Sequence, residues 1–172
     1  MVESIWFVVA LVLLAAVSVA LVLMIVLYTE KRDPGRQTRT QYRTADYTRE
    51  AGFRLSDYPN DPLVILRRRW LIDGDIAALD YTIVPGRFMT LFVARRGRMQ
   101  PPEGYNAEDA ENVEQYEIDG LTVTQNQQAG RRALVYWVRG EFEYLIYSEE
   151  PEMNMMNGMA YYFVRNTLAV RT

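Results

Sequence analysis

The sequence predicts an α+β protein in which an N-terminal transmembrane helix precedes a curved antiparallel sheet of about seven strands, backed by a C-terminal helix. Three observations predict it. The first is an uncharged, almost wholly apolar run over residues 5–28. The second is a series of seven short runs, rich in β-branched and aromatic residues, between residues 63 and 147. The third is a final segment whose apolar residues recur at three- and four-residue spacing, as on one face of a helix.

The apolar run is long enough to cross a membrane. At 1.5 Å rise per residue, residues 5–28 extend about 36 Å, whereas a hydrocarbon core is roughly 30 Å thick. Trp6 and Tyr28 stand near its two ends, where amphipathic rings favour the membrane interface. We therefore expect residues 1–30 to be a transmembrane anchor. Cleavage after Ala20 as a signal peptide is the alternative, but a basic n-region is missing and eight apolar residues still follow that position.

Basic residues cluster directly after the anchor. Residues 31–41 contain Pro34 and Gly35 and no apolar side chain, which predicts a solvated juxtamembrane tether. Positive charges favour the cytoplasmic side, so the cluster favours a cytoplasmic domain; a long domain can also be translocated against such a bias, and an extracytoplasmic domain stays open. Besides setting topology, these side chains could contact anionic lipid at the membrane surface. The expected contacts are Lys31, Arg32, Arg36, Arg39 and Arg43.

Residues 42–172 are expected to form the folded α+β domain. Asp73-Gly74 and Asp119-Gly120 each separate two apolar runs, and Asp-Gly favours the type I′ turn of a β-hairpin. Because links this short join antiparallel neighbours, we expect an antiparallel sheet. The seven predicted strands are Leu63–Leu66, Ile76–Val84, Phe88–Val93, Val113–Ile118, Leu121–Thr124, Leu134–Val138 and Phe142–Tyr147.

Other segments connect or cover these strands. A short helix is expected over Thr44–Ala51, a loop over Ser56–Pro62 and a longer loop over residues 97–112. Leu134–Val138 is apolar on both faces, which favours a central strand covered on both sides. A C-terminal helix is the expected cover for one side of the sheet. Its apolar face consists of Met156, Met159, Ala160, Phe163, Val164 and Thr167.

The composition excludes several kinds of site. Without Cys or His, the chain has no disulfide, no thiolate nucleophile, no Ser-His-Asp triad and no Cys- or His-ligated metal. Asp73, Asp75 and Asp80 could in principle bind a hard cation, but a plain hairpin turn explains the first two better. The methionines between residues 153 and 159 could form a soft-metal site, but core filling on a helix or an adaptable contact surface explains them better. We therefore predict no cofactor and no enzymatic activity.

Charge is distributed unevenly along the chain. Residues 31–100 carry 14 basic and 8 acidic side chains, a net +6, whereas residues 101–172 carry 5 basic and 12 acidic side chains, a net −7. Nucleic-acid binding requires a strongly basic domain, and this chain has a net charge of −3. Arg67, Arg68 and Arg69 should also alternate between faces of a strand, so no continuous basic stripe is expected. We predict no nucleic-acid partner.

The segment Leu134–Asn166 resembles part of a known group of domains. It comprises a strand with Tyr136 and Trp137, a tight turn at Gly140, a strand with Tyr144 and then a helix. In this order it is similar to uncharacterised sheet-plus-helix domains of bacterial membrane proteins, some of which follow the transmembrane helix of anti-sigma regulators. The resemblance implies a sheet domain outside the cell and carries over no functional residue.

Two functions follow from these features. A retained anchor, a domain rich in aromatic residues and the lack of a catalytic set favour a non-catalytic, single-pass accessory subunit of a larger membrane protein complex. Its expected partners are membrane lipid and other membrane-protein subunits. The alternative is a membrane-anchored extracytoplasmic sensing or ligand-binding domain with an apolar pocket between sheet and helix.

Overall fold

A computed structural model describes residues 37–83, 86–102, 110–128, 132–149 and 153–172 of the chain. Residues 38–172 form one compact unit. The predicted anchor, residues 1–30, and the predicted tether up to residue 36 lie outside the described residues. Within the described part of the chain, no helix is long and apolar enough to span a membrane.

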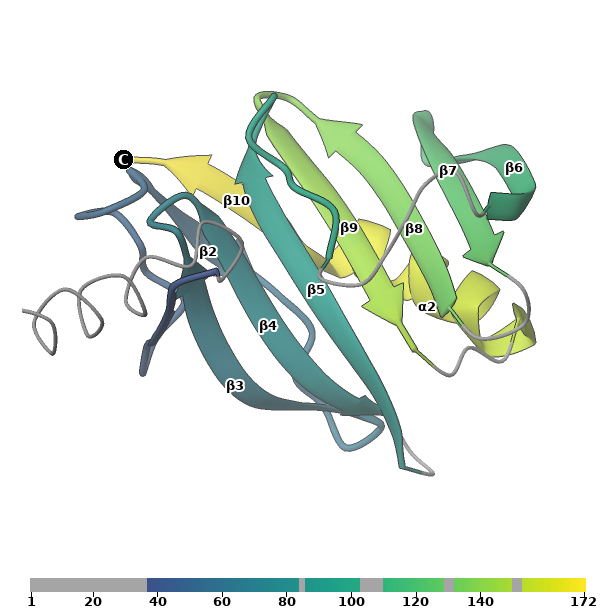
Figure 1. The fold of residues 1–172 in the computed structure, drawn as a ribbon, viewed down its shortest axis with the longest axis horizontal. Coiled ribbons are helices and arrows are strands. Elements are labelled where there is room, and N and C mark those ends of the chain that lie inside the picture. Colours follow the sequence, from purple (N-terminus) through teal and green to yellow (C-terminus); the bar gives the residue numbers. More distant parts are fainter. Residues whose placement is uncertain (1–36, 84–85, 103–109, 129–131, 150–152) are drawn as a thin grey trace, which may run out of the picture. The chain divides into compact units, whose positions relative to one another are not determined.

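An eight-stranded antiparallel sheet dominates the domain, in the order β1-β3-β4-β5-β9-β8-β7-β6 (Figure 1). A second, two-stranded antiparallel sheet pairs β2 with β10. The elements are β1 (Arg39–Gln41), β2 (Phe53–Asp57), β3 (Val64–Ile72), β4 (Ile76–Ile83), β5 (Arg87–Arg95), β6 (Ala110–Ile118), β7 (Leu121–Gln128), β8 (Arg132–Arg139), β9 (Phe142–Ser148), α2 (Met153–Asn166) and β10 (Leu168–Arg171).

The seven predicted strands are confirmed as β3 to β9, and their hairpin links pair consecutive strands as expected. At both Asp-Gly links the aspartate as well as the glycine has a positive φ: 50° at Asp73 and 51° at Asp119. A type I′ turn requires this backbone conformation at both of its central residues. The Asp73 side chain adds a second role, because its Oδ1 accepts a hydrogen bond from the Thr38 amide at 2.8 Å and so fixes the start of β1.

The sheet consists of two meanders joined at one seam. β3, β4 and β5 form the first, and β6, β7, β8 and β9 form the second. β5 pairs with β9 and not with β6, the next strand in sequence, with Thr90 opposite Tyr147 and Arg95 opposite Phe142. The chain therefore passes from the middle of the sheet to its far edge between β5 and β6 (Figure 1).

Three sequence expectations are wrong. Thr44–Ala51 is not a helix: it ends in a single hydrogen-bonded turn, where the amides of Ala51 and Gly52 both donate to the Tyr47 carbonyl at 2.8 and 3.1 Å. Arg39–Gln41 belongs to the sheet and not to a tether, because it pairs with β3. The strand count of about seven omitted the short strands β1, β2 and β10, whose pairing partners are remote in sequence.

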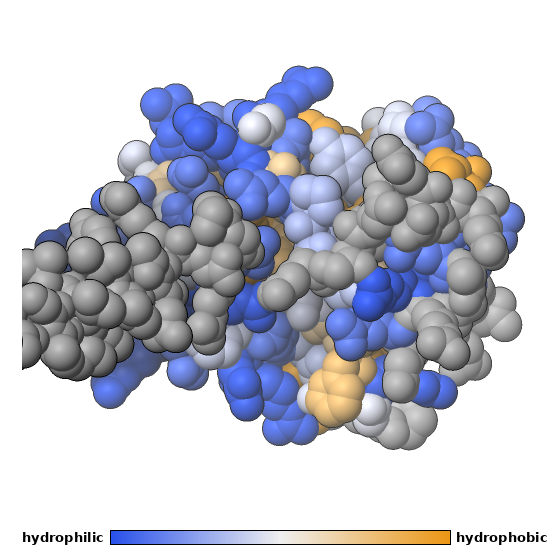
Figure 2. Space-filling view, in the orientation of Figure 1, coloured by the Kyte–Doolittle hydropathy of each residue, from blue (hydrophilic) through white to orange (hydrophobic). Residues whose placement is uncertain are grey.

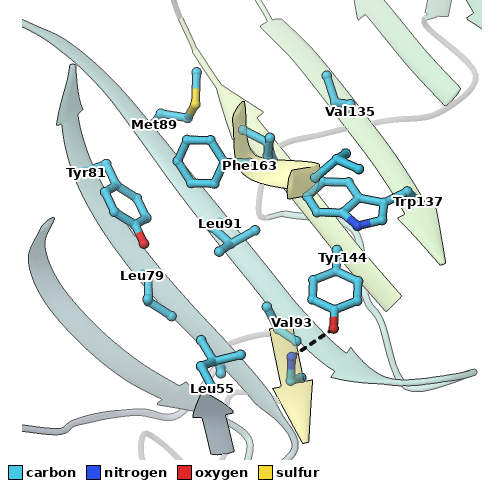
Figure 3. Close-up of a cluster of buried hydrophobic side chains, with 14 of the residues drawn as sticks. Leu55, Leu79, Tyr81, Met89, Leu91, Val93, Val135, Trp137, Tyr144 and Phe163 are labelled. Carbon is cyan, nitrogen blue, oxygen red and sulfur yellow. Dashed lines mark hydrogen bonds between the residues drawn. The ribbon is translucent and has the colours of Figure 1, made fainter. Parts of the chain in front are cut away.

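Helix α2 covers one face of the large sheet, behind the strands in Figure 1. The expected apolar face is confirmed, since Met156, Ala160, Phe163 and Val164 are fully buried and Met159 is partly buried against the core. Phe163 packs edge-on against Tyr81 of β4, with ring centroids 5.1 Å apart. Figure 3 shows Phe163 and Tyr81 among other buried side chains of the core. The methionines of α2 whose side chains are described thus fill the core.

Hydrogen bonds fix the C-terminal end of α2. The Arg139 guanidinium of β8 donates to the carbonyl oxygens of Val164 and Thr167 at 2.6 and 3.0 Å, where a helix leaves carbonyls unpaired. Beyond the helix, the Ala169 amide donates to the Tyr144 hydroxyl at 3.0 Å, drawn as the dashed line in Figure 3. These hydrogen bonds therefore fix the path of the chain from the end of α2 into β10, which pairs with β2.

A hydrogen bond from the helix to a loop predicts how stability changes with pH. The Tyr162 hydroxyl donates to Asp61 Oδ2 and is the main cause that holds the pKa of Asp61 below its usual range. The same bond raises the pKa of Tyr162 to about 12. A lowered carboxyl pKa means that the ionised form stabilises the fold: the contribution is present above the unfolded pKa of about 3.9 and is lost as pH falls through the folded value.

We expect Tyr162→Phe to lower the free energy of unfolding at neutral pH, and this difference to shrink as the pH falls through the lowered pKa of Asp61. Urea unfolding of the full-length chain in detergent, followed by near-UV circular dichroism at several pH values, measures this. Tyr161→Phe, on the exposed neighbouring residue, is the control. If the Tyr162→Phe and wild-type curves stay parallel through the acid range, the bond has no such role.

Candidate functional site: the open face of the sheet

The two faces of the eight-stranded sheet differ. The covered face carries the large core beneath α2. The other face, here called the open face, carries a smaller apolar cluster and lies toward the viewer in Figures 1 and 2, where pale and orange atoms appear among blue ones. Its buried members are Ile72, Ile76, Ala78, Phe92, Ala94, Leu134, Leu145 and Tyr147. Successive residues of β9 alternate between the two faces, with Tyr144 on the covered face and Leu145 on the open face.

A groove of about 590 Å³ lies on the open face. Aromatic side chains from three strands line it: Trp70 of β3, Phe88 and Phe92 of β5, and Tyr147 of β9. A fourth strand, β4, contributes Asp80. Phe88 is 74% exposed although it is a large apolar side chain. This groove does not lie between sheet and helix, where the sequence predicts a pocket; there the described side chains pack into the buried core.

The carboxylate of Asp80, in the groove, is held in a defined orientation. Asp80 Oδ2 accepts a hydrogen bond from the Trp70 indole Nε1 at 2.8 Å, and its Oδ1 accepts one from the Thr90 hydroxyl at 3.0 Å. The register explains this contact, because Thr90 lies directly opposite Asp80 and Trp70 lies opposite Ala78, two residues away on the same face. Two donors on neighbouring strands thus satisfy a half-buried charge on β4.

A β-bulge in β3 changes the expected arrangement of its three arginines. The register shifts between Leu66 and Arg68, so that Arg68 lies opposite Asp80 on the open face. Arg67 also turns to this face, where its Nε donates to the Thr82 hydroxyl at 3.1 Å. A bulge places two residues opposite one, so the strict alternation predicted for these arginines fails. Only Arg69 points to the covered face, where it lies over the Tyr58 ring.

Arg67 and Arg68 border a second hollow of about 700 Å³. Asp80, Phe88 and Thr90 line both this hollow and the groove. The two depressions are therefore parts of one trough along β3, β4 and β5, with Asp80 and Phe88 at the point where they meet. Such a trough can recognise a ligand through its shape, its aromatic walls and one fixed negative charge.

A second carboxylate on the open face has a structural role. Glu143 of β9 is 8% exposed, and its two oxygens accept hydrogen bonds from the Tyr136 hydroxyl at 3.2 Å and from the Met99 amide at 3.1 Å. Burial and the neighbouring Glu143 raise the pKa of Tyr136. Glu143 thereby attaches the segment that follows β5 to the middle of the sheet.

The structure locates only part of the predicted membrane-contact set. Arg39 lies in β1 and lines one end of the groove, and Arg43 lies exposed just after β1. Contact of these side chains with lipid stays a prediction. The other predicted residues, Lys31, Arg32 and Arg36 and the interface anchors Trp6 and Tyr28, lie outside the described residues.

Sequence reasoning missed the residues that form the trough. Asp80 was considered only as a metal ligand, yet in the described part of the chain no group of three acidic residues could hold a metal ion. A signal was present: Asp80 is the one charge within the otherwise apolar run 76–84. The register that brings Trp70 and Thr90 to it could not be known from that pattern.

Comparisons with known protein families, with curated proteins and with solved structures found no match for this chain.

The Trp70–Asp80 contact predicts a measurable coupling. Trp70→Phe should lower the free energy of unfolding by about 1.5–3 kcal/mol, because a hydrogen bond to a charged group is lost while most of the ring remains. In a double-mutant cycle with Asp80→Ala, measured by urea unfolding, the two effects should be non-additive by more than about 0.5 kcal/mol. Full additivity would show that the two side chains do not interact. Trp137→Phe, in the core, is the comparison outside this network.

Proposed function

We propose that this chain is a non-catalytic, single-pass accessory subunit of a larger membrane protein complex, and that its domain of residues 38–172 is a docking module. Docking uses the open face of the sheet. The anchor is the predicted transmembrane segment of residues 5–28, and the domain is cytoplasmic by the positive charges that follow it.

One observation supports docking above all: the two faces of the sheet differ in what covers them. α2 and its core close one face, whereas the other carries an aromatic trough with Phe88 exposed at its centre. A contiguous apolar surface with a polar border is typical of a surface that binds another molecule. Aromatic and arginine side chains, which line this trough, are enriched in protein interfaces.

The chemistry of the trough fits binding better than catalysis. Both oxygens of Asp80 already accept hydrogen bonds from neutral donors. The chain supplies no His or Cys to serve as a general base or nucleophile beside it. Aromatic rings and a carboxylate held by hydrogen bonds can position a ligand group, and docking requires no further chemistry.

A second candidate is a membrane-anchored extracytoplasmic sensing or ligand-binding domain. The groove volume of about 590 Å³ favours it, because pockets for small molecules fall in this range. In this case the ligand is a free small molecule and the domain lies on the other side of the membrane.

We expect the protein, extracted from its native membranes in a mild detergent, to migrate with partner subunits on a native gel. Phe88→Asp should abolish this co-migration, because it places a charge at the centre of the trough. Val113→Asp is the matched control: Val113 is also a largely exposed apolar residue, but it lies on the edge strand β6. A wild-type chain that migrates alone contradicts the proposal, as does equal loss in both variants.

The side of the membrane can be measured separately. The chain has no native Cys, so Thr122→Cys creates a single exposed label site in β7. A membrane-impermeant maleimide should leave this cysteine unlabelled in intact cells and label it after lysis. Labelling in intact cells would refute the cytoplasmic orientation and favour the second candidate.

A further inference from the structure

We propose that the groove on the open face binds a basic side chain, lysine or arginine, of a protein segment of the partner. Asp80 is the counter-charge and the aromatic residues are the walls. This inference rests on the docking function proposed above and names the chemistry that docking uses.

The carboxylate of Asp80 is placed to receive a cation. Trp70 and Thr90 hold its two oxygens from the sides, and each carboxylate oxygen can accept a further hydrogen bond. Of the described basic residues, Arg68 is its cross-strand neighbour, yet the two form no ion pair. A half-buried carboxylate that accepts hydrogen bonds from two neutral donors attracts a cation from outside.

The walls favour a cation as well. Trp70, Phe88, Phe92 and Tyr147 line the same groove as Asp80. The faces of such rings are electronegative and attract lysine and arginine side chains within about 6 Å of the ring centroid. Rings also accommodate the apolar stem of these side chains, which a partner would bury on entering the groove.

The charges at the border indicate that the cation belongs to a protein segment. Arg39 lines one end of the groove, and Arg67 and Arg68 border the adjoining hollow. They repel a free cation but attract acidic residues that flank a basic one. The elongated trough suits an extended segment of this alternating charge better than a small compact ion. Glu149, at the groove, adds a second negative charge for the basic residue.

Binding can be observed at the groove itself. The Trp70 indole N–H bonded to Asp80 gives its own signal in a ¹⁵N-labelled full-length chain in detergent, and Trp137 in the core is an internal reference. We expect n-butylammonium, which matches the lysine side chain, to shift the Trp70 signal saturably and to leave Trp137 unchanged. Butyrate, of similar size and opposite charge, should leave both unchanged.

Variants test the two parts of the site. Asp80→Asn should weaken n-butylammonium binding about tenfold. Phe88→Ala, at an exposed position that does not threaten folding, should weaken it about threefold through the lost ring face. Glu117→Gln, which removes an exposed carboxylate on β6, should have no effect.

Two peptides test the source of the cation. A capped tripeptide with lysine between two glutamates should bind more tightly than one with lysine between two glycines, because of Arg39, Arg67 and Arg68. If it does not, or if tetramethylammonium binds more than about tenfold more tightly than n-butylammonium, the ligand is a free cation and the protein segment is refuted.

Failure of this inference can be told from failure of the docking function. Absence of a Trp70 shift with n-butylammonium, or a shift with butyrate in its place, overturns the cation site. Neither result changes the co-migration of the protein with its partners, which the native gel measures independently.

Discussion

The pairing of β5 with β9 is the interaction on which the rest of the domain depends. It joins two meanders that are each built from local hairpins, and it places Leu91 opposite Ile146 and Val93 opposite Tyr144, all fully buried. Complete burial of aliphatic side chains such as Leu91 contributes about 1.5–3 kcal/mol each. Helix α2 contacts both meanders, because its Phe163 packs on β4 of one while Arg139 of the other caps its end.

The same seam creates the open face. Phe92 and Leu145 lie opposite each other on it, and the groove extends from there to Tyr147 on one side and Trp70 on the other. A sheet covered on one face only keeps part of its apolar surface for other contacts. Asp80 gives this surface a specific feature, because a held carboxylate among aromatic rings distinguishes one ligand charge from the other.

The division of charge along the chain becomes a division in space. The basic part of the sequence, residues 31–100, contains β1 and the meander of β3 to β5, whereas the acidic part contains the meander of β6 to β9. The arginines at the trough are a consequence, since Arg39, Arg67 and Arg68 all lie on β1 or β3 at one side of the sheet. The β3 bulge adds to this concentration of positive charge, because it turns Arg67 and Arg68 to the same face.

Features that depend on neighbours along the chain could be predicted from the sequence. The seven strands, the Asp-Gly turns and the buried face of α2 follow from side-chain periodicity and from backbone preferences at residues such as Asp73 and Asp119. Which remote segments meet could be learned only from the folded domain. The β5–β9 seam, the short strands β1, β2 and β10, and the contact of Trp70 and Thr90 with Asp80 all depend on register between segments whose distance in sequence leaves no local pattern.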